Sequence, residues 1–119
     1  MIISVTEFFQ VQQAIKMQHW ATSDYSLHVL LDDFYKDYSD LVDDIVEIVL
    51  GWHTNSIEVL PVKPFDAAFS NLESLLQLTG KSFDEVRQNI DKMPKGTRTV
   101  MDEVDKFLSK YTYLFAKFQ

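Results

Sequence analysis

Glycine and proline are scarce and unevenly placed, and this distribution constrains the fold more than any other feature of the sequence. The 119 residues contain three Gly and three Pro, and all six lie between residues 51 and 96. Both residue types interrupt helices, glycine through its backbone entropy and proline through its missing N–H. The chain is therefore expected to be mostly helical, with its longest helices before residue 51 and after residue 96.

Apolar residues recur at helical spacing along the first half of the chain. The first helix is expected from Thr6, which can cap it, to about Ala21, with Phe9 and Ile15 on its apolar side. The second, from about Asp24 to Leu50, has the clearest apolar face, and Gly51 is placed to end it. That face comprises Leu27, Leu30, Leu31, Phe34, Tyr38, Leu41, Ile45, Ile48 and Val49.

The middle of the chain predicts a connection and then a third helix. Residues 52–64 are expected to be irregular because Pro61 and Pro64 lie close together. Helical spacing returns over residues 65–78, and Gly80 is placed as the stop signal.

A shorter helical segment follows Gly80. Ser82 and Glu85 have the spacing of a capping box, and the segment reaches about Met93 before Pro94. This segment is either a helix of its own or the continuation of the third helix after a kink.

The last helix is expected from Thr97 to about Phe118. Four main helices joined in this way predict an all-α fold, a four-helix bundle with an irregular connection and a broken third helix, in one domain over residues 1–119. The apolar side of the last helix comprises Val100, Val104, Phe107, Leu108, Tyr111, Leu114 and Phe115.

Charge and composition exclude several classes of partner. The net charge of -7 disfavours nucleic acid and anionic membranes and favours cations. The absence of Cys excludes disulfides and thiolate metal sites, so any metal site must use His and carboxylates. The N-terminus lacks the features of a signal peptide and no apolar run is long enough for a membrane span, so we expect a cytoplasmic protein.

One stripe of the second helix combines a histidine with three carboxylates. At about 100° per residue, His28, Asp32, Asp43 and Glu47 fall within about 100° of one another and opposite the apolar face. His28 and Asp32 are one turn apart, and so are Asp43 and Glu47. The two pairs are separated by roughly 20 Å along the helix axis. One copy of the helix therefore cannot close a site around one ion.

A second copy of the helix, antiparallel across a two-fold axis between residues 37 and 38, would complete the set. His28 then faces Glu47 of the second copy and Asp32 faces Asp43, because each pair of numbers sums to 75. In the same register Val29 meets Val46 and Tyr25 meets Leu50, which suits an isologous interface.

Imidazole with several carboxylates is a ligand set that can hold Fe(II) and Fe(III), and Zn or Mn could bind the same groups. From the residues alone two other interpretations stay open. The acidic stripe could be a solvated helix face, and a histidine beside a tryptophan could serve packing.

The motif resembles that of the Dps-like mini-ferritins, a branch of the ferritin-like proteins. Those proteins have a His-Trp pair late in the first helix and then His-x3-Asp-x10-Asp-x3-Glu along the second. Here His19-Trp20 is followed by His28, Asp32, Asp43 and Glu47 at those spacings. The specific resemblance covers residues 17–51, and the chain is shorter than typical members.

The resemblance implies a ferritin-like bundle and an iron-binding ferroxidase site between two-fold related subunits. His19, His28 and Asp32 of one subunit, with Asp43 and Glu47 of the other, would bind Fe(II), and Glu47 would be the bridging ligand. Such proteins oxidise iron, preferentially with peroxide, and store it in a dodecamer. The resemblance fits a short, divergent member encoded by a bacterium or a phage. The lysine-rich tail with which some members bind DNA is absent.

Two alternative functions stay open. One is a non-catalytic ferritin-like module that binds, inhibits or assembles another protein through its acidic surface. The other is a structural or regulatory protein that binds Zn or Mn without redox turnover.

Overall fold

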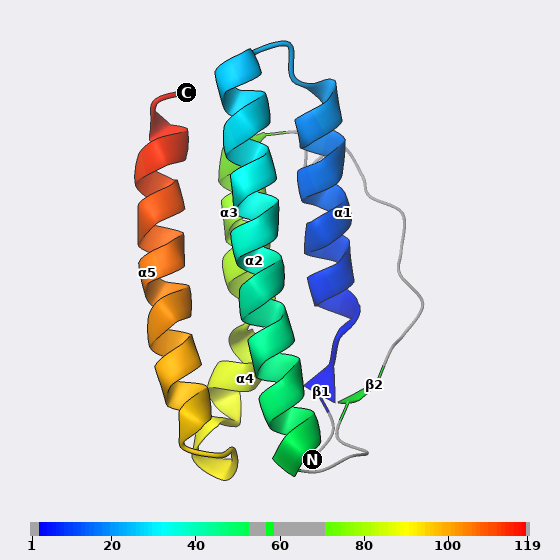
Figure 1. The fold of residues 1–119 in the computed structure, drawn as a ribbon, viewed down its shortest axis with the longest axis vertical. Helices are drawn as coiled ribbons and strands as arrows, with labels where there is room; N and C mark the ends of the chain where they lie inside the picture. Colours follow the sequence, from blue (N-terminus) through cyan, green and yellow to red (C-terminus); the bar gives the residue numbers. More distant parts are fainter. Residues whose placement is uncertain (1–2, 53–56, 59–70, 119) are drawn as a thin grey trace.

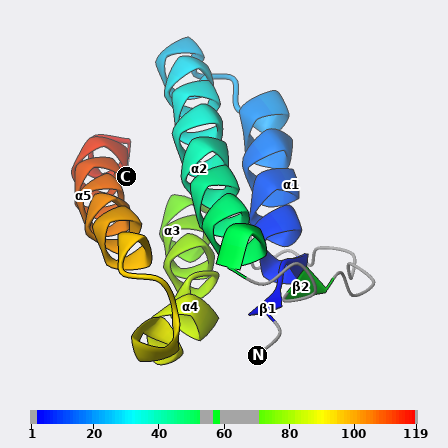
Figure 2. The ribbon, with the colours of Figure 1, turned by 60° about the horizontal axis from the view of Figure 1, so that its bottom comes forward.

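Four helices lie side by side in the computed structural model, which describes residues 3–52, 57–58 and 71–118. They are α1 (Thr6–Ala21), α2 (Tyr25–Trp52), α3 (Leu72–Lys81) and α5 (Gly96–Ala116), with the short α4 (Asp84–Gln88) and a 3₁₀ turn, η2 (Ile90–Lys92), between the last two (Figures 1 and 2). α2 packs against α1 and α5, and α3 packs against the same two helices from the other side. The fold is therefore an all-helical bundle, as expected.

The direction of the helices follows from their ends. α1 and α2 form an antiparallel hairpin, while α2 ends and α3 begins at opposite ends of the bundle, so these two helices run parallel (Figure 1). α5 returns antiparallel to α3. None of the described helices is long and apolar enough to cross a membrane.

The bounds of the first two helices differ little from expectation. α1 covers Thr6–Ala21, but Thr6 is inside the helix and not its cap, and Ser4 Oγ accepts the hydrogen bond from the Thr6 N–H. α2 begins one residue later than expected because Asp24 acts as its cap, its Oδ1 accepting from the Leu27 N–H at 3.2 Å. The helix also runs through Gly51 to Trp52, because no described glycine adopts the positive φ of a helix stop.

The third helix begins at Leu72, where the Asn71 side chain accepts from the Ser74 N–H at 2.7 Å. The earlier part of the predicted helix, residues 65–70, and most of the predicted connection lie outside the described residues. The prediction that Gly80 ends the helix is wrong, since α3 continues to Lys81.

The predicted capping box is also wrong, because both of its side chains make tertiary contacts. Ser82 Oγ lies 2.8 Å from the Tyr38 hydroxyl and donates to the Thr79 carbonyl, and Glu85 accepts from the Ser4 N–H. α4 therefore begins at Asp84 without a side-chain cap. The third element is broken after Lys81, as predicted. Between Lys81 and Met93, only Asp84–Gln88 and Ile90–Lys92 are helical.

A pair of short strands was not expected. β1 (Ile3–Ser4) and β2 (Ile57–Glu58) run parallel, with Ile3 opposite Ile57 and Ser4 opposite Glu58. The pair joins the residues just before α1 to residues 57–58.

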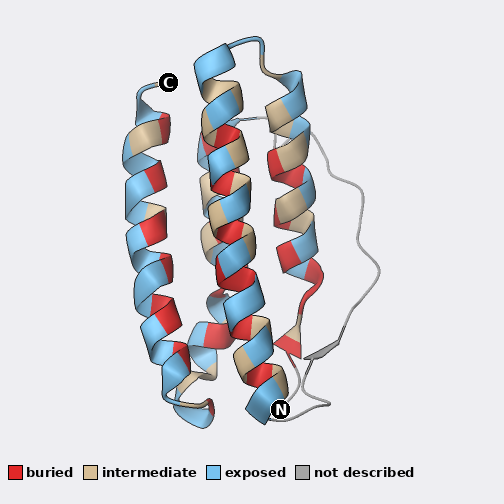
Figure 3. Cartoon of the chain, viewed as in Figure 1, coloured by how far each residue is buried: buried red, intermediate tan, exposed pale blue. Residues whose placement is uncertain are grey.

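The buried faces of the helices turn toward the inside of the bundle (Figure 3). Aromatic rings make up much of this core. Phe34 of α2 stacks on Phe107 at a centroid distance of 5.1 Å and contacts Tyr111 and Phe115 edge-on. On α1 the buried ring is Phe8, whereas Phe9, expected on the apolar side, is 42% exposed. The apolar faces predicted for α2 and α5 are buried or partly buried.

Two buried tyrosines bind polar groups at the edge of this core. Burial, and then the hydrogen bond that the Tyr111 hydroxyl donates to the Asp37 carboxylate, raise the Tyr111 pKa far above its usual value. Burial also raises the pKa of Tyr38. Both hydroxyls therefore stay protonated and act as hydrogen-bond donors.

Removing the Tyr111 hydroxyl is expected to destabilise the fold. The Tyr111→Phe variant loses the hydrogen bond to the Asp37 carboxylate. Hydrogen bonds to charged groups contribute about 1.5–3 kcal/mol to the free energy of unfolding. Asp37 stays partly exposed and can be solvated, so we expect a loss near the lower end. Urea unfolding checks this, and an unchanged free energy of unfolding would contradict it.

Candidate metal site

Two histidines face each other where α1 passes into α2. The His19 and His28 rings are stacked, with centroids 3.8 Å apart and planes inclined by 20°. His19 is in the last turn of α1, and His28 is in the first turn of α2. They are level with one another because the helices are antiparallel and joined by only three residues, 22–24. The ring of Tyr25 is also stacked with that of His28, with centroids 6.2 Å apart.

The two histidines hold one another through reciprocal hydrogen bonds. His19 Nδ1 lies 2.8 Å from the His28 carbonyl oxygen, and His28 Nδ1 lies 2.7 Å from the His19 carbonyl oxygen. A carbonyl oxygen can only accept, so each Nδ1 carries a proton and donates it. In the neutral ring this leaves Nε2 with the lone pair. Fixing one ring nitrogen on a backbone carbonyl is how proteins commonly orient a metal-binding histidine.

Asp32 lies one turn beyond His28 and interacts with basic groups. Its Oδ2 is 3.0 Å from Lys36 Nζ, one helical turn further along. The hydrogen bond from Lys36, with smaller contributions from His19 and Lys16, holds the pKa of the Asp32 carboxyl below its usual value of 3.8. Asp32 is therefore ionised at neutral pH, and a cation that binds it competes with Lys36.

The effect of Lys36 can be measured directly. In the Lys36→Met variant the pKa of Asp32 is expected to rise toward 3.8, because the largest cause of its shift is removed. A carboxyl group whose pKa is lowered by folding stabilises the folded state fully at pH values above its usual pKa of 3.8. This contribution is lost as the pH falls through the lowered pKa. Titration of the Asp32 carboxyl carbon by NMR checks the shift, and an unchanged pKa would show that Lys36 does not bind Asp32 in solution.

The other two predicted ligands lie far down the same helix. Asp43 and Glu47 are exposed, whereas His19, His28 and Asp32 are partly buried. All four stripe residues of α2 lie outside its buried set, which consists of Leu31, Phe34, Tyr38, Leu41, Val42, Ile45 and Val49. Their side chains are thus available to solvent or to another molecule.

The chain brings together one part of the predicted ligand set and separates the other. His19 and His28 are in contact and Asp32 is one turn away, but Asp43 and Glu47 are three to four turns further along α2. Among the described residues, no group of three or more His, Asp or Glu side chains is placed to hold one ion within a single chain. The third histidine, His53, lies outside the described residues.

Sequence reasoning missed the contacts that orient the site. The spacing of nine residues across a tight turn could have indicated that His19 and His28 face each other. The reciprocal bonds to carbonyl oxygens had no sequence signal, because they depend on the path of the backbone. The bond between Lys36 and Asp32 could have been expected from their i,i+4 spacing.

Comparison with known proteins identifies a family. One protein-family profile, described as a family of unknown function (DUF5856), matches residues 19–115. The chain belongs to this family. The DUF5856 match begins at His19, so it includes every predicted ligand and, except for the last residue of α5, all the helices after α1. No curated protein matches the chain, and no solved structure does either.

Proposed function

We propose that this protein binds Fe(II) and oxidises it, with peroxide as the preferred oxidant, at a site shared by two copies of the chain. His19, His28 and Asp32 of one copy would act together with Asp43 and Glu47 of the other. Two equivalent sites would form in each dimer. The proposal rests on the resemblance of residues 17–51 to the Dps-like mini-ferritins and on the geometry of the histidine pair.

The observation that carries the proposal is the reciprocal bonding of the two histidines. Both Nδ1 atoms donate to backbone carbonyl oxygens at 2.7–2.8 Å, so each ring in its neutral form keeps the Nε2 lone pair for a metal ion. A pair of histidines used only for packing would not need both rings held in this tautomer. The nearby ionised Asp32 adds the negative charge that a divalent cation requires.

The order of helix directions supports the ferritin-like part of the proposal. Ferritin-like bundles contain one long crossover between helices. When the second and third helices run parallel, the chain must return along the bundle between them, which requires such a crossover. α2 and α3 run parallel here (Figure 1). The core is built from all four of the long helices, as in a bundle of that kind.

In this mechanism iron is the substrate and the chain supplies its ligands. Two Fe(II) ions each give one electron to hydrogen peroxide, the O–O bond breaks, and two protons complete two water molecules. The carboxylates of Asp32, Asp43 and Glu47 would favour the ferric product, because they neutralise its higher charge. The two imidazoles would keep the ferrous form bound before oxidation.

The test is to mix metal-free protein anaerobically with Fe(II), add stoichiometric peroxide, and follow the ferric absorbance and light scattering together. Oxidation faster than in buffer, saturating at a fixed ratio of iron to protein, is the expected result. A particle of dodecamer size would extend the proposal to storage. Oxidation no faster than in buffer would contradict it, and parallel titrations with Zn and Mn would then detect binding without redox turnover.

A non-catalytic interaction module is the second candidate. It is favoured by the large apolar side chains exposed on the α1–α2 hairpin, among them Met17, Trp20 and Tyr25. Exposed apolar groups that lie close together are typical of protein interfaces. This function requires no metal, so it predicts that alanine substitutions of the predicted ligands leave partner binding unchanged.

A further inference from the structure

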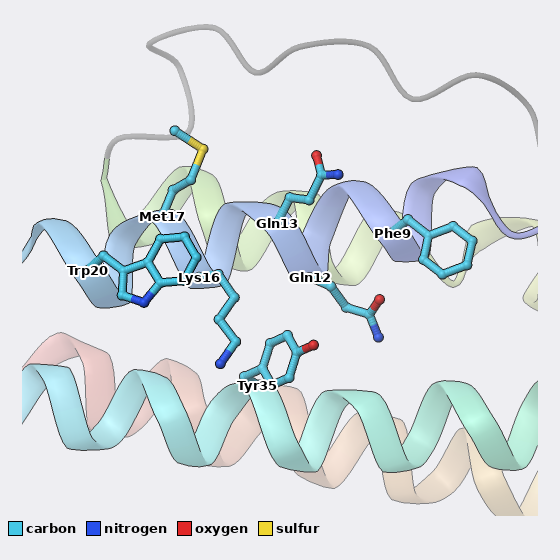
Figure 4. Close-up of a pocket in the computed structure, with 7 residues that line it drawn as sticks. All are labelled: Phe9, Gln12, Gln13, Lys16, Met17, Trp20 and Tyr35. Atoms are coloured by element: carbon cyan, nitrogen blue, oxygen red, sulfur yellow. The ribbon is translucent and has the colours of Figure 1, made fainter.

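An apolar groove runs along the outer side of α1, next to the proposed metal site. Seven side chains line it, with Phe9, Gln12, Lys16 and Trp20 following α1 and Tyr35 rising from α2 (Figure 4). Lys16 Nζ lies over the Tyr35 ring, 4.3 Å from its centroid, and is also one of the charges that act on Asp32. The groove and the acidic stripe of α2 are therefore parts of one continuous face.

The outer side of α1 exposes apolar side chains beside its polar ones. Its inner side buries Phe8, Val11, Ala14 and Ile15, as a bundle helix should. Its outer side carries large apolar groups as well, and helices that are apolar on both sides are normally buried on both. Phe9, Met17 and Trp20 are nevertheless exposed by 42%, 55% and 72% in the single chain.

Charge allows a second copy of the chain to approach this side of α1. The protein carries a net charge of -7, so two copies repel one another over most orientations. None of the seven residues that line the groove is acidic, and Lys16 is basic. Two copies can thus approach through this part of α1 without bringing carboxylates together.

Symmetry provides an independent argument for the same partner. The α2 stripe requires a two-fold axis at the level of residues 37 and 38, perpendicular to the helix and in the plane of the interface. Because α1 lies beside α2 and antiparallel to it, this axis also passes over α1.

The level at which the axis crosses α1 follows from two contacts between the helices. Gln12 Nε2 donates to Ser39 Oγ at 3.2 Å, and the His19 ring stacks on that of His28. Counting along both helices at 1.5 Å per residue from these contacts, the axis crosses α1 between about residues 9 and 14. That interval contains Gln12 and Gln13, whose amides can both donate and accept and so can pair with their own copies.

We infer that the groove on α1 is the second half of the dimer interface, in which α1 packs antiparallel against α1 of a second copy while the α2 stripes meet beside it. The inference rests on the proposed function for the position of the axis. It adds Phe9, Met17 and Trp20 as apolar contacts and places Gln13 close to the two-fold axis. The metal site would then be closed by packing of α1 as well as by its ligands.

A cysteine cross-link tests this arrangement without using metal. The chain contains no Cys, so Gln13→Cys introduces a single thiol on the groove side, and Ser109→Cys introduces one at an exposed position of α5 as the matched control. A short bismaleimide is expected to join two copies of the Gln13→Cys variant efficiently and those of the control only at background level. Equal yields for the two variants would overturn the inference.

A charge placed in the groove gives the second test. Met17→Glu puts a carboxylate into the apolar part of the interface in each copy, where it loses water without gaining a partner, so the dimer dissociation constant is expected to rise at least about 100-fold. Sedimentation measures the constant, and far-UV circular dichroism verifies that the exposed substitution leaves the helices intact. An unchanged constant would overturn the inference. A cross-linked dimer that does not oxidise Fe(II) would refute the proposed function and leave the interface standing.

Discussion

Replacing Glu47 by alanine is expected to abolish Fe(II) binding and oxidation and to leave the fold intact. Glu47 is exposed on α2, so its removal creates no cavity and breaks no core contact. A direct ligand, as Glu47 is proposed to be, should contribute more than an outer-shell partner, whose loss costs about 10–100-fold in metal affinity. We therefore expect a loss of at least about 100-fold. Anaerobic calorimetric titration with Fe(II) measures this, and Asp43→Ala is expected to behave similarly.

The matched control is Asp44→Ala. Asp44 has the same charge and exposure as Asp43 but lies about 100° further round the helix, outside the stripe. Its replacement should leave Fe(II) affinity within a few-fold of the unmodified protein, as expected for a change in surface charge alone. If Glu47→Ala and Asp43→Ala bound Fe(II) as tightly as Asp44→Ala, the ligand assignment would be refuted.

The largest effect on stability is expected for Phe34→Ala. The Phe34 ring is fully buried and contacts Phe107, Tyr111 and Phe115 of α5, so its removal leaves a cavity between α2 and α5. Loss of a buried phenyl ring typically costs about 3–5 kcal/mol. Urea unfolding at one fixed protein concentration measures the change, since a dimer would make the apparent stability depend on concentration.

Tyr113→Ala provides the comparison for that experiment. Tyr113 is also on α5, but it is 65% exposed, and surface substitutions usually change stability by no more than about 0.5 kcal/mol. A similar loss for both variants would mean that the aromatic cluster around Phe34 is not the centre of the core.

The helices could be predicted because their signals are local. The apolar faces of α2 and α5 repeat with helical spacing over many turns, and the buried residues follow them closely. The first helix agrees with the predicted bounds to within a residue, but Phe9, predicted on the apolar side, is 42% exposed. Phe8 and Phe9 are adjacent, and periodicity alone cannot decide which one faces the core when both sides of a helix carry apolar groups.

The errors lie where a local signal competes with a tertiary contact. Ser82 and Glu85 have capping-box spacing, but Tyr38 and the Ser4 backbone bind them instead. The strand pair joins residues more than fifty positions apart, and no local pattern specifies such a pairing. Gly51 and Gly80 stay inside helices because a glycine permits a helix stop without requiring one.

For the candidate site, the sequence predicts which residues share a face but not how they are held. The α2 stripe follows from helical geometry, and its residues lie outside the core. The stacking of His19 on His28 and the two Nδ1 bonds depend on the turn between α1 and α2. Whether a second copy completes the site is a property of the assembly and remains a prediction.

Complementation between two variants that are each expected to be inactive tests that prediction most directly. If the site is shared as proposed, His28→Ala and Glu47→Ala would each damage both sites of their own homodimer. In a mixed dimer, one site combines the intact His28 of one copy with the intact Glu47 of the other, and the second site carries both defects. If the subunits exchange at random, half of the dimers are mixed and each has one intact site of two, so about a quarter of the sites are functional.

The measurement is the Fe(II) oxidation rate with peroxide after the two variants have been mixed in equal amounts, unfolded in urea and refolded together. A shared site predicts about a quarter of the activity of the unmodified protein in the mixture, and almost none in either variant refolded alone. A mixture as inactive as its two components, when unmodified protein recovers its activity after the same treatment, would contradict a site built from two copies of the chain.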